Sequence, residues 1–405
     1  MYQLLSGLSI VEASSFVASP TAGLYLAQLG AEVIRVDQIG GGPDFRRWPQ
    51  APNGTSLYWE NLNRAKKSVA LDLSRPEGRE LMQALAASTG QFLTNFPAAG
   101  FLAHDRLAGR RPDLITVRVM GTADGGPALD YTVNAAIGIP QLTGPPELGE
   151  QPVNHVLPAW DLLTGAYAAF TMLAAVQHRL ASAQGGEYRI ALQDVATGSV
   201  ANLGMLAESL LGAGRPRLGN HVFGAFGRDF VTADGTRLML MAITPRQWSG
   251  LVAVLGLGEA VAQIEAQRGV SFASDEGVRF AHREALFPIV EEAVGTRQAP
   301  ELLAELERNG CCFGAYRTMA EAARDPGLVT DNAIFGAAPN PSGEEYLAAG
   351  PFLAASGRTR GAPRSAPQLG AHTAEVLAER LGMSGAEIAT LQGHGIVAQA
   401  PSERT

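Results

Sequence analysis

Short apolar segments alternate with segments of helical periodicity along the first third of the chain. Residues 8–11 are apolar, residues 20–29 repeat their apolar positions at helical spacing, and residues 32–36 alternate as a strand does. Further strands are expected at residues 68–71, 91–94 and 114–119. A capping box formed by Ser74 and Glu77 marks the start of another helix. Strands that alternate with helices predict an α/β fold with a parallel sheet, whose ligands bind outside the carboxyl ends of the strands.

The stretch NHVLPAWDLLTGAYAAF, residues 154–170, places the carboxylate of Asp161 between an apolar approach and an apolar helix expected over residues 162–180. Asp is a preferred N-cap residue, and caps are far commoner than catalytic carboxylates. A reactive carboxylate is the second interpretation, because helix N–H groups and the helix dipole keep a partly buried carboxylate ionised, as a nucleophile must be. The two roles are compatible, so the pattern leaves both open.

The regular alternation of strands and helices ends in the second half of the chain. A strand is expected at residues 187–193 and a helix at 195–211, and a Gly- and Arg-rich stretch at 214–228 indicates the exit from a domain. Asp234 and Gly235 predict a hairpin between strands. Further elements are expected as helices within 246–309, a strand at 311–316, and helices at 319–324, 373–381 and 384–391.

Composition narrows the classes of function. With 405 residues, of which 46% are hydrophobic, the chain can bury a large core and is expected to form two domains. The net charge of −8 and the absence of a basic run argue against a nucleic-acid partner. Adjacent Cys311 and Cys312 and seven scattered histidines predict neither a disulfide nor a metal site. We expect no signal peptide, no membrane partner, since the uncharged run at 162–177 is short for a span, and a cytoplasmic location.

Four stretches carry a family resemblance: LSGLSIVEASSFVASPTAGLYLAQLGAEVIRVD, LNRAKKSVALDLSRPEGRE, LPAWDLLTGAYAAFTMLAAV and APQLGAHTAEVLAERLGMSGAEI. They span nearly the whole chain, which resembles the family III CoA-transferases. The resemblance implies a Rossmann-like large domain, a smaller α+β domain and an interlocked homodimer. The expected large domain begins with residues 1–213, followed by a linker at 214–227, a small domain at 228–330, and a linker and C-terminal return at 331–405.

The resemblance also implies a site. The nucleophile at the matching position is Asp161, and no cofactor is bound permanently, because CoA arrives as part of an acyl-CoA thioester substrate. CoA is expected to contact Asn63, Lys66, Asn95 and Phe96. Backbone N–H groups at Val17 and Ala18 are the expected oxyanion donors. The candidates for holding a free carboxylate of the substrate are Arg47, Asn134 and His155.

Departures from the family pattern narrow the expected activity. Racemases of the group place a His before the Asp at the position of Asp130, where this chain has Leu129, so racemisation is not expected. The segments GGGPDFRRWP, DYTVN and GNHVFGAFGRDF resemble the branch that moves CoA between the two carboxyls of one branched unsaturated dicarboxylate. The alternatives are an intermolecular CoA-transferase and a non-catalytic acyl-CoA-binding protein.

Overall fold

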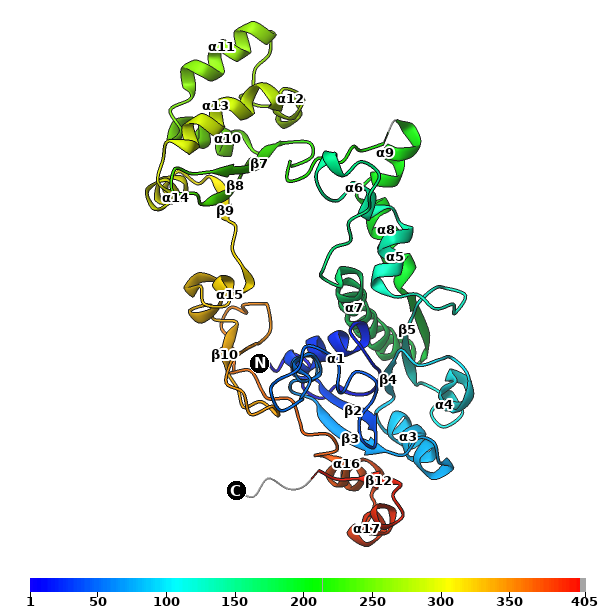
Figure 1. Cartoon of the computed structure of the whole chain (residues 1–405). Coiled ribbons are helices and arrows are strands. Elements are labelled where there is room, and N and C mark those ends of the chain that lie inside the picture. The colour runs from blue at the N-terminus through cyan, green and yellow to red at the C-terminus, as the bar shows by residue number, and fades with distance from the viewer. Residues whose placement is uncertain (213, 401–405) are drawn as a thin grey trace. The chain divides into compact units, whose positions relative to one another are not determined.

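The computed structural model describes residues 1–212 and 214–400, which form two compact units (Figure 1). The first unit comprises residues 1–137, 156–207 and the described residues from 326 onward, and the second comprises residues 138–155 and 208–325. The first unit is built on a seven-stranded sheet in the order β12-β3-β2-β1-β4-β5-β6. Its strands are β1 (Ser9–Ala13), β2 (Glu32–Gln38), β3 (Lys67–Leu71), β4 (Gln91–Thr94), β5 (Ile115–Met120), β6 (Gly186–Ala191) and β12 (Val397–Ala398).

Strands β1 to β6 are parallel, and their order 3-2-1-4-5-6 is that of the Rossmann fold. The predicted α/β class is therefore confirmed. Alternate residues of each buried strand face opposite layers of helices, so that Ile10 packs with the α1 and α7 side and Val11 with the other. The helices of this unit are α1 (Ala18–Gln28), α2 (Leu57–Leu62), α3 (Pro76–Thr89), α4 (His104–Ala108), α5 (Asp130–Ala136), α7 (Ala159–Ser182), α8 (Leu192–Asn202), α16 (Thr373–Leu381) and α17 (Gly385–Gly393).

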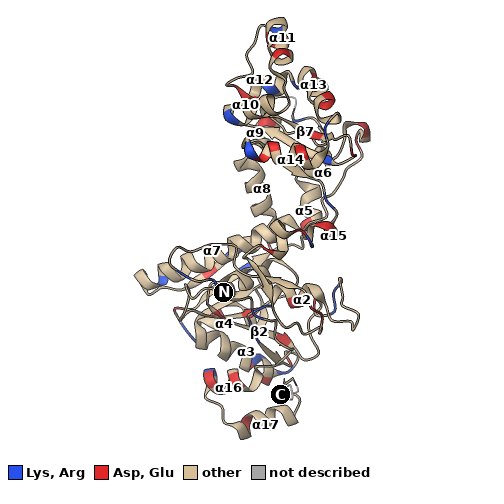
Figure 2. Cartoon of the chain, turned by 90° about the vertical axis from the view of Figure 1, so that its left-hand side faces the viewer, with Lys and Arg blue, Asp and Glu red and all other residues tan. Residues whose placement is uncertain are grey.

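Helix α7 is the long helix of this unit and lies beside α1 (Figure 1). One of its faces is buried, including Thr164, Gly165, Ala168 and Met172. Figure 2 shows it largely without charged residues. Its 24 residues also satisfy the length and hydropathy of a membrane span, a test that the core helices of soluble proteins pass as well.

The second unit has its own core. Strands β7 (Phe226–Val231), β8 (Arg237–Ala242) and β9 (Cys312–Ala315) form an antiparallel sheet, and β7 and β8 make the predicted hairpin, with Gly235 at a φ of 82°. Aromatic side chains of Phe226, Phe230, Trp248 and Phe287 fill the space between this sheet and its helices. Those helices are α10 (Pro245–Val254), α11 (Gly258–Arg268), α12 (Glu276–Ala281), α13 (Arg283–Gly295) and α14 (Ala299–Arg308).

The remaining described elements are short. The second unit also contains α6 (Ile139–Leu142), a 3₁₀ turn (Pro146–Leu148) and α15 (Met319–Ala322), while α9 (Met205–Leu211) lies where the chain passes from the first unit to the second. The first unit also contains a 3₁₀ turn (Gly100–Leu102), a π-helical turn (Pro326–Thr330), and the antiparallel pair β10 (Phe335–Ala337) and β11 (Leu347–Ala349).

Several sequence-based boundaries differ from the structure. The helix expected over 195–211 is divided into α8 and α9 at Gly204, which has a φ of 77°. Ser74 is not the N-cap of α3; that residue is Arg75, and the Ser74 hydroxyl donates instead to Asp72 at 2.6 Å. The chain passes between the units after residues 207 and 325, whereas the sequence placed these boundaries at 213, 227 and 330. Residues 138–155, expected in the large domain, also join the second unit.

Long-range hydrogen bonds explain that last difference. Arg217 donates to the carbonyls of Pro140 (3.2 Å) and Gln141 (3.1 Å), and the Gly219 amide donates to the Gly144 carbonyl at 3.0 Å. These bonds join segments more than 70 residues apart in the chain. Local periodicity carries no record of such pairings, so the sequence pattern could not assign the segment.

Candidate active site

The order of the strands reverses between β1 and β4, and the loops after these two strands meet. The Ser15 amide donates to Asn95 Oδ1 at 3.0 Å, and Asn95 Nδ2 donates to the Ser15 carbonyl at 2.7 Å. The neighbouring Phe16 has a φ of 67°, in the left-handed region, and its amide donates to Asp44 Oδ2 at 3.1 Å. Asn95, predicted to contact CoA, thus clamps the loop that begins the ligand crevice of this fold.

Helix α1 starts directly after this loop. Val17 is its N-cap residue, Ala18 is its first residue, and both are buried. The first N–H groups of a helix have no carbonyl partner within the helix. The predicted oxyanion donors at Val17 and Ala18 therefore lie at a helix N-terminus, where N–H groups favour negative charge.

Gly165 brings the start of α7 close to the start of α1. A Cβ atom at position 165 would lie 2.6 Å from the Ala18 carbonyl oxygen and 2.8 Å from Cβ of Thr21, so only glycine permits this packing. Asp161 lies one turn earlier on the same side of α7, since residues four apart share a helix face. The contact at Gly165 therefore directs Asp161 towards the beginning of α1.

Asp161 is not the N-cap of α7, so that interpretation of the sequence is wrong. The N-cap residue is Pro158, and the side chain that takes the helix N–H groups comes from Asp130 on α5. Asp130 Oδ2 accepts from the amides of Trp160 (2.7 Å) and Asp161 (3.1 Å). Burial, and then the negative charge of Asp130, raise the pKa of Asp161 to about 6, while the opposing charge of Arg47 lowers it.

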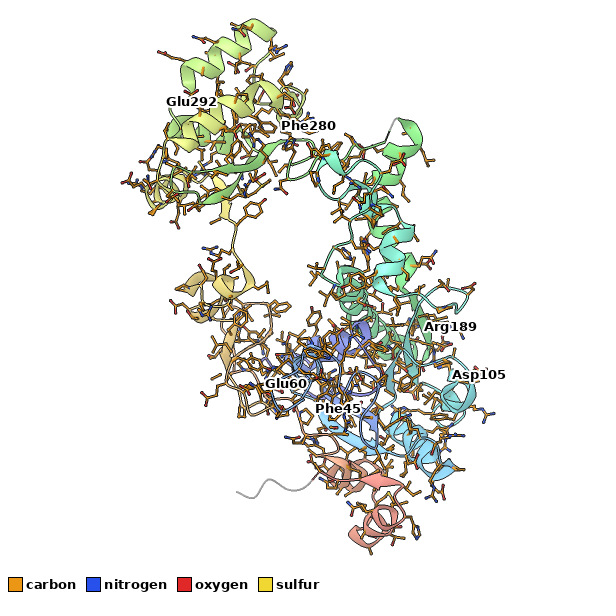
Figure 3. All side chains as sticks on the ribbon, in the orientation of Figure 1. Phe45, Glu60, Asp105, Arg189, Phe280 and Glu292 are labelled. Atoms are coloured by element: carbon orange, nitrogen blue, oxygen red, sulfur yellow. The ribbon has the colours of Figure 1, made fainter. Side chains whose placement is uncertain are left out.

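The guanidinium group of Arg47 is positioned by two aromatic rings. Its guanidinium carbon lies 5.4 Å from the centre of the Phe16 ring and 5.5 Å from that of Tyr58. Phe45, labelled in Figure 3, lies two residues before Arg47. Its ring meets that of Trp59 edge-on, with the ring centres 5.1 Å apart, and this contact anchors the segment that carries Arg47. The predicted substrate cation is thus exposed, oriented by aromatic rings and electrostatically coupled to Asp161.

Sequence reasoning missed Tyr58. Burial raises its pKa to about 12, with a further contribution from the charge of Asp161, so its hydroxyl keeps its proton at neutral pH. A protonated hydroxyl beside a reactive carboxylate can donate a hydrogen bond to substrate. The local signal was Ser56, whose hydroxyl caps α2 by accepting from the Trp59 amide and so fixes the turn that carries Tyr58.

Asn63 and Lys66, predicted to contact CoA, lie inside the fold. Lys66 Nζ donates to Glu12 (3.1 Å), to the Pro20 carbonyl (2.9 Å) and to Asn63 Oδ1 (2.9 Å), and the Lys66 side chain has no exposed surface. Burial lowers the pKa of Lys66 to about 8, opposed by the charge of Glu12. Arg35 also binds Asn63, at 3.0 Å. Lys66 thus binds the start of α1 and Asn63 binds Lys66 and Arg35, both from buried positions, and their contact with CoA stays a prediction.

The other predicted residues occupy three kinds of environment. Phe96 is partly buried against the core, and its carbonyl accepts from Arg118 at 2.6 Å. Asn134 is fully buried and accepts from the Trp160 indole at 3.0 Å, which makes it a support of the α7 start. His155 is partly buried and belongs to the second unit, and its role towards substrate stays a prediction.

The sequence model of CoA-transferase family III matches residues 5–373. The chain belongs to CoA-transferase family III. It is 43% identical, over 98% of both chains, to 2-methylfumaryl-CoA isomerase of Chloroflexus aurantiacus. It is 30% identical to succinate–glutarate CoA-transferase of Agrobacterium fabrum, over 93% of this chain and 95% of that one.

A solved structure supports the fold. A CAIB/BAIF family protein from Brucella suis superposes with a TM-score of 0.75 at 27% identity, over 94% of this chain and all of that chain. The protein is therefore a CoA-transferase or isomerase enzyme of family III, a family that acts on CoA thioesters.

Proposed function

We propose that the enzyme moves CoA between the C1 and C4 carboxyls of mesaconyl-CoA, also called 2-methylfumaryl-CoA. The observation that carries this proposal is the 43% identity, over 98% of both chains, to a relative named 2-methylfumaryl-CoA isomerase. The site is consistent with it, because a single half-buried carboxylate lies near one exposed arginine. One nucleophile and one cation are sufficient for a substrate that carries both carboxyls itself.

The proposed first half-reaction uses Asp161 as the nucleophile. Its carboxylate attacks the C1 thioester carbonyl, the carbon–sulfur bond breaks, and a mixed anhydride and CoA thiolate form. The thiolate then attacks the aspartyl carbonyl of the anhydride, which releases free mesaconate and leaves an aspartyl-CoA thioester. A carboxylate with a pKa of about 6 is mostly ionised at neutral pH and more basic than an ordinary aspartate, which favours attack.

The second half-reaction reverses these steps at the other end of the substrate. The C4 carboxylate of mesaconate attacks the aspartyl-CoA thioester, and thiolate leaves. The thiolate then attacks the C4 carbonyl of the anhydride and sets Asp161 free, so that no proton or electron is gained or lost overall. Arg47 holds the carboxylate that is not reacting, and the N–H groups at Val17 and Ala18 stabilise each tetrahedral oxyanion.

An intermolecular transfer is the second candidate, favoured by the 30% identity to succinate–glutarate CoA-transferase. Incubation with mesaconyl-C1-CoA alone, followed by chromatography, distinguishes the two. Formation of the C4 thioester without any added acid supports the proposal. Turnover that requires a second acid favours intermolecular transfer, and stoichiometric binding without turnover favours an acyl-CoA-binding protein.

The proposal includes a cytoplasmic homodimer, interlocked as the family resemblance implies. Its support is an exposed apolar stripe on α7, where Leu163, Tyr167 and Phe170 are 41%, 52% and 65% exposed. Their spacing of four and three residues places them along one side of the helix. Apolar stripes of this kind mark interaction surfaces. A monomeric mass in light scattering at micromolar concentration would contradict the dimer.

A further inference from the structure

The start of α7 satisfies its free backbone donors without using the side chain of Asp161. The Ala159 amide donates to the Leu157 carbonyl at 2.8 Å, and the Leu162 amide donates to the Pro158 carbonyl at 3.1 Å. The two amides between them, those of Trp160 and Asp161, donate to Asp130 Oδ2. Because the N-cap residue Pro158 has no N–H, the amides of residues 159–161 are the ones that the helix start leaves free, and all three are thereby accounted for.

The first turn of α7 also lacks the backbone donor that the Asp161 side chain could otherwise bind within its own helix. Asp161 is the third residue of α7, and an acidic side chain at that position commonly reaches back to the N–H of the N-cap residue. Here the N-cap residue is Pro158, which has no N–H. Within the described residues the Asp161 carboxylate accordingly makes no hydrogen bond to α7.

Asp130 is well placed to take over the capping role. It is 2% exposed, it is the first residue of α5, and its charge lies at the positive end of a 24-residue helix, where a carboxylate is stabilised. Hydrogen bonds from N–H groups to a carboxylate are also stronger than those to a neutral acceptor. Asn134, one turn later on α5, binds the Trp160 indole and fixes the same turn from a second point.

We propose that Asp130 is a positioning residue for CoA transfer: by capping α7 in place of Asp161, it holds the backbone of Asp161 while leaving that carboxylate free to attack the thioester. This inference rests on the proposed function for its chemical meaning. The charged and titratable groups that face Asp161 are Asp130 from α5, Arg47 from the segment before α2, and Tyr58 from α2. The negative charge of Asp130 also keeps the pKa of Asp161 high.

Two substitutions separate the two effects of Asp130. Asp130→Asn keeps an oxygen that accepts both amides and removes the charge, whereas Asp130→Ala removes both. Asp124→Asn is the matched control, because Asp124 follows β5 in the same connection and accepts the Gly126 amide at 3.2 Å without facing Asp161. The first measurement is the pH midpoint of carbodiimide labelling at Asp161, read by peptide mass spectrometry, which requires no turnover.

The second measurement is the single-turnover rate of CoA transfer from mesaconyl-C1-CoA, at a pH above every labelling midpoint. Asp130→Asn is expected to lower the midpoint and to retain most of the rate. Asp130→Ala is expected to be slower than Asp130→Asn by roughly ten- to a hundred-fold, because small displacements of a reacting group are costly. The control should match the unmodified enzyme in both measurements.

An unchanged midpoint in Asp130→Asn, or equal rates in the Asn and Ala variants, would overturn the proposal. If Asp130→Ala does not fold, Asp130→Ser, whose shorter side chain cannot span both amides, takes its place in the rate comparison with Asp130→Asn. Failure of the proposed function gives a different result: the unmodified enzyme would not form the C4 thioester from mesaconyl-C1-CoA alone, while the labelling midpoint of Asp130→Asn would still move.

Discussion

The carboxylate of Asp130 accepts the backbone amide of Asp161 at 3.1 Å, so one acid holds the main chain of the other. A helix N-terminus stabilises negative charge, and here the buried acid occupies it. Asp161 consequently experiences repulsion from Asp130 and attraction from Arg47, with burial as the largest influence on its pKa. The balance leaves a carboxylate that is ionised at neutral pH yet unusually basic.

Replacing Asp161 tests the nucleophile. We expect Asp161→Ala and Asp161→Asn to lose at least roughly a thousand-fold in turnover, because neither side chain can form the acyl anhydride. Mass spectrometry of the denatured protein should show a CoA adduct only in the unmodified enzyme. Asp113→Asn, at a carboxylate that pairs with Arg111, is the control and should behave as the unmodified enzyme does. Turnover above a trace in the Ala variant would show that another group attacks.

The raised pKa of Asp161 also has a consequence for stability. Its value of about 6 in the folded chain exceeds the value of about 3.9 for an unfolded aspartate, so ionisation of Asp161 destabilises the fold. That cost is absent below about pH 4 and complete above about pH 6. Asp161→Asn should therefore raise the Tm at about pH 8 more than at about pH 4, as measured by calorimetry. An equal change at both pH values would show that Asp161 has an ordinary pKa.

Arg47 is expected to act on both substrate and nucleophile. Arg47→Ala should lower kcat/KM by roughly 10- to 150-fold, since hydrogen bonds to a charged group contribute about 1.5–3 kcal/mol. Removing the cation should also raise the pKa of Asp161, so the acid limb of the pH–rate profile should move to higher pH. Arg46→Ala is the neighbouring control. A lower kcat/KM with an unmoved acid limb would assign Arg47 to substrate binding alone.

Intramolecular transfer predicts that free mesaconate stays in the site until it is esterified again. The reaction of mesaconyl-C1-CoA is run with an excess of isotopically labelled mesaconate, and label in the C4 thioester is measured by mass spectrometry. We expect little label, because the bound acid reacts at a high effective concentration that the free pool cannot match. Label that approaches the composition of the free pool would instead identify an intermolecular CoA-transferase.

Because Leu129 stands where racemases of the family have a histidine, we expect the enzyme to have no racemase activity. Leu129 is the N-cap residue of α5, its side chain is 68% exposed, and a hydrocarbon cannot exchange a proton. In deuterated water, 2-methylacyl-CoA esters should therefore keep their α-proton in the presence of the enzyme. Rapid deuterium incorporation would show that another acid–base pair flanks the α-carbon.

Sequence pattern could predict the local parts of this fold. Strand β4 and helix α16 have the expected bounds, because alternation, helical periodicity and end residues are properties of neighbouring positions. Strand β12 was missed: it has two residues and pairs with β3, more than 300 positions earlier in the chain.

The site was predicted unevenly for the same reason. Asp161 stood out as a lone charge before an apolar helix, but its cap comes from Asp130, 31 positions earlier. The side chain of Lys66 reads as a surface cation in the sequence, yet its carboxylate partner is Glu12, 54 positions away. Ser56 marks the turn that carries Tyr58, but the pKa of Tyr58 depends on burial and on Asp161, which no local pattern records.

The backbone contact at Gly165 fixes the distance between the start of α1 and the start of α7. The main chain of α7 rests on the Ala18 carbonyl with no room for a side chain, so that spacing does not depend on the residues lining the substrate. Residues around the site can therefore be exchanged without changing the separation between the proposed nucleophile and the proposed oxyanion donors. Such a division would let the lining of the site change without moving the start of either helix.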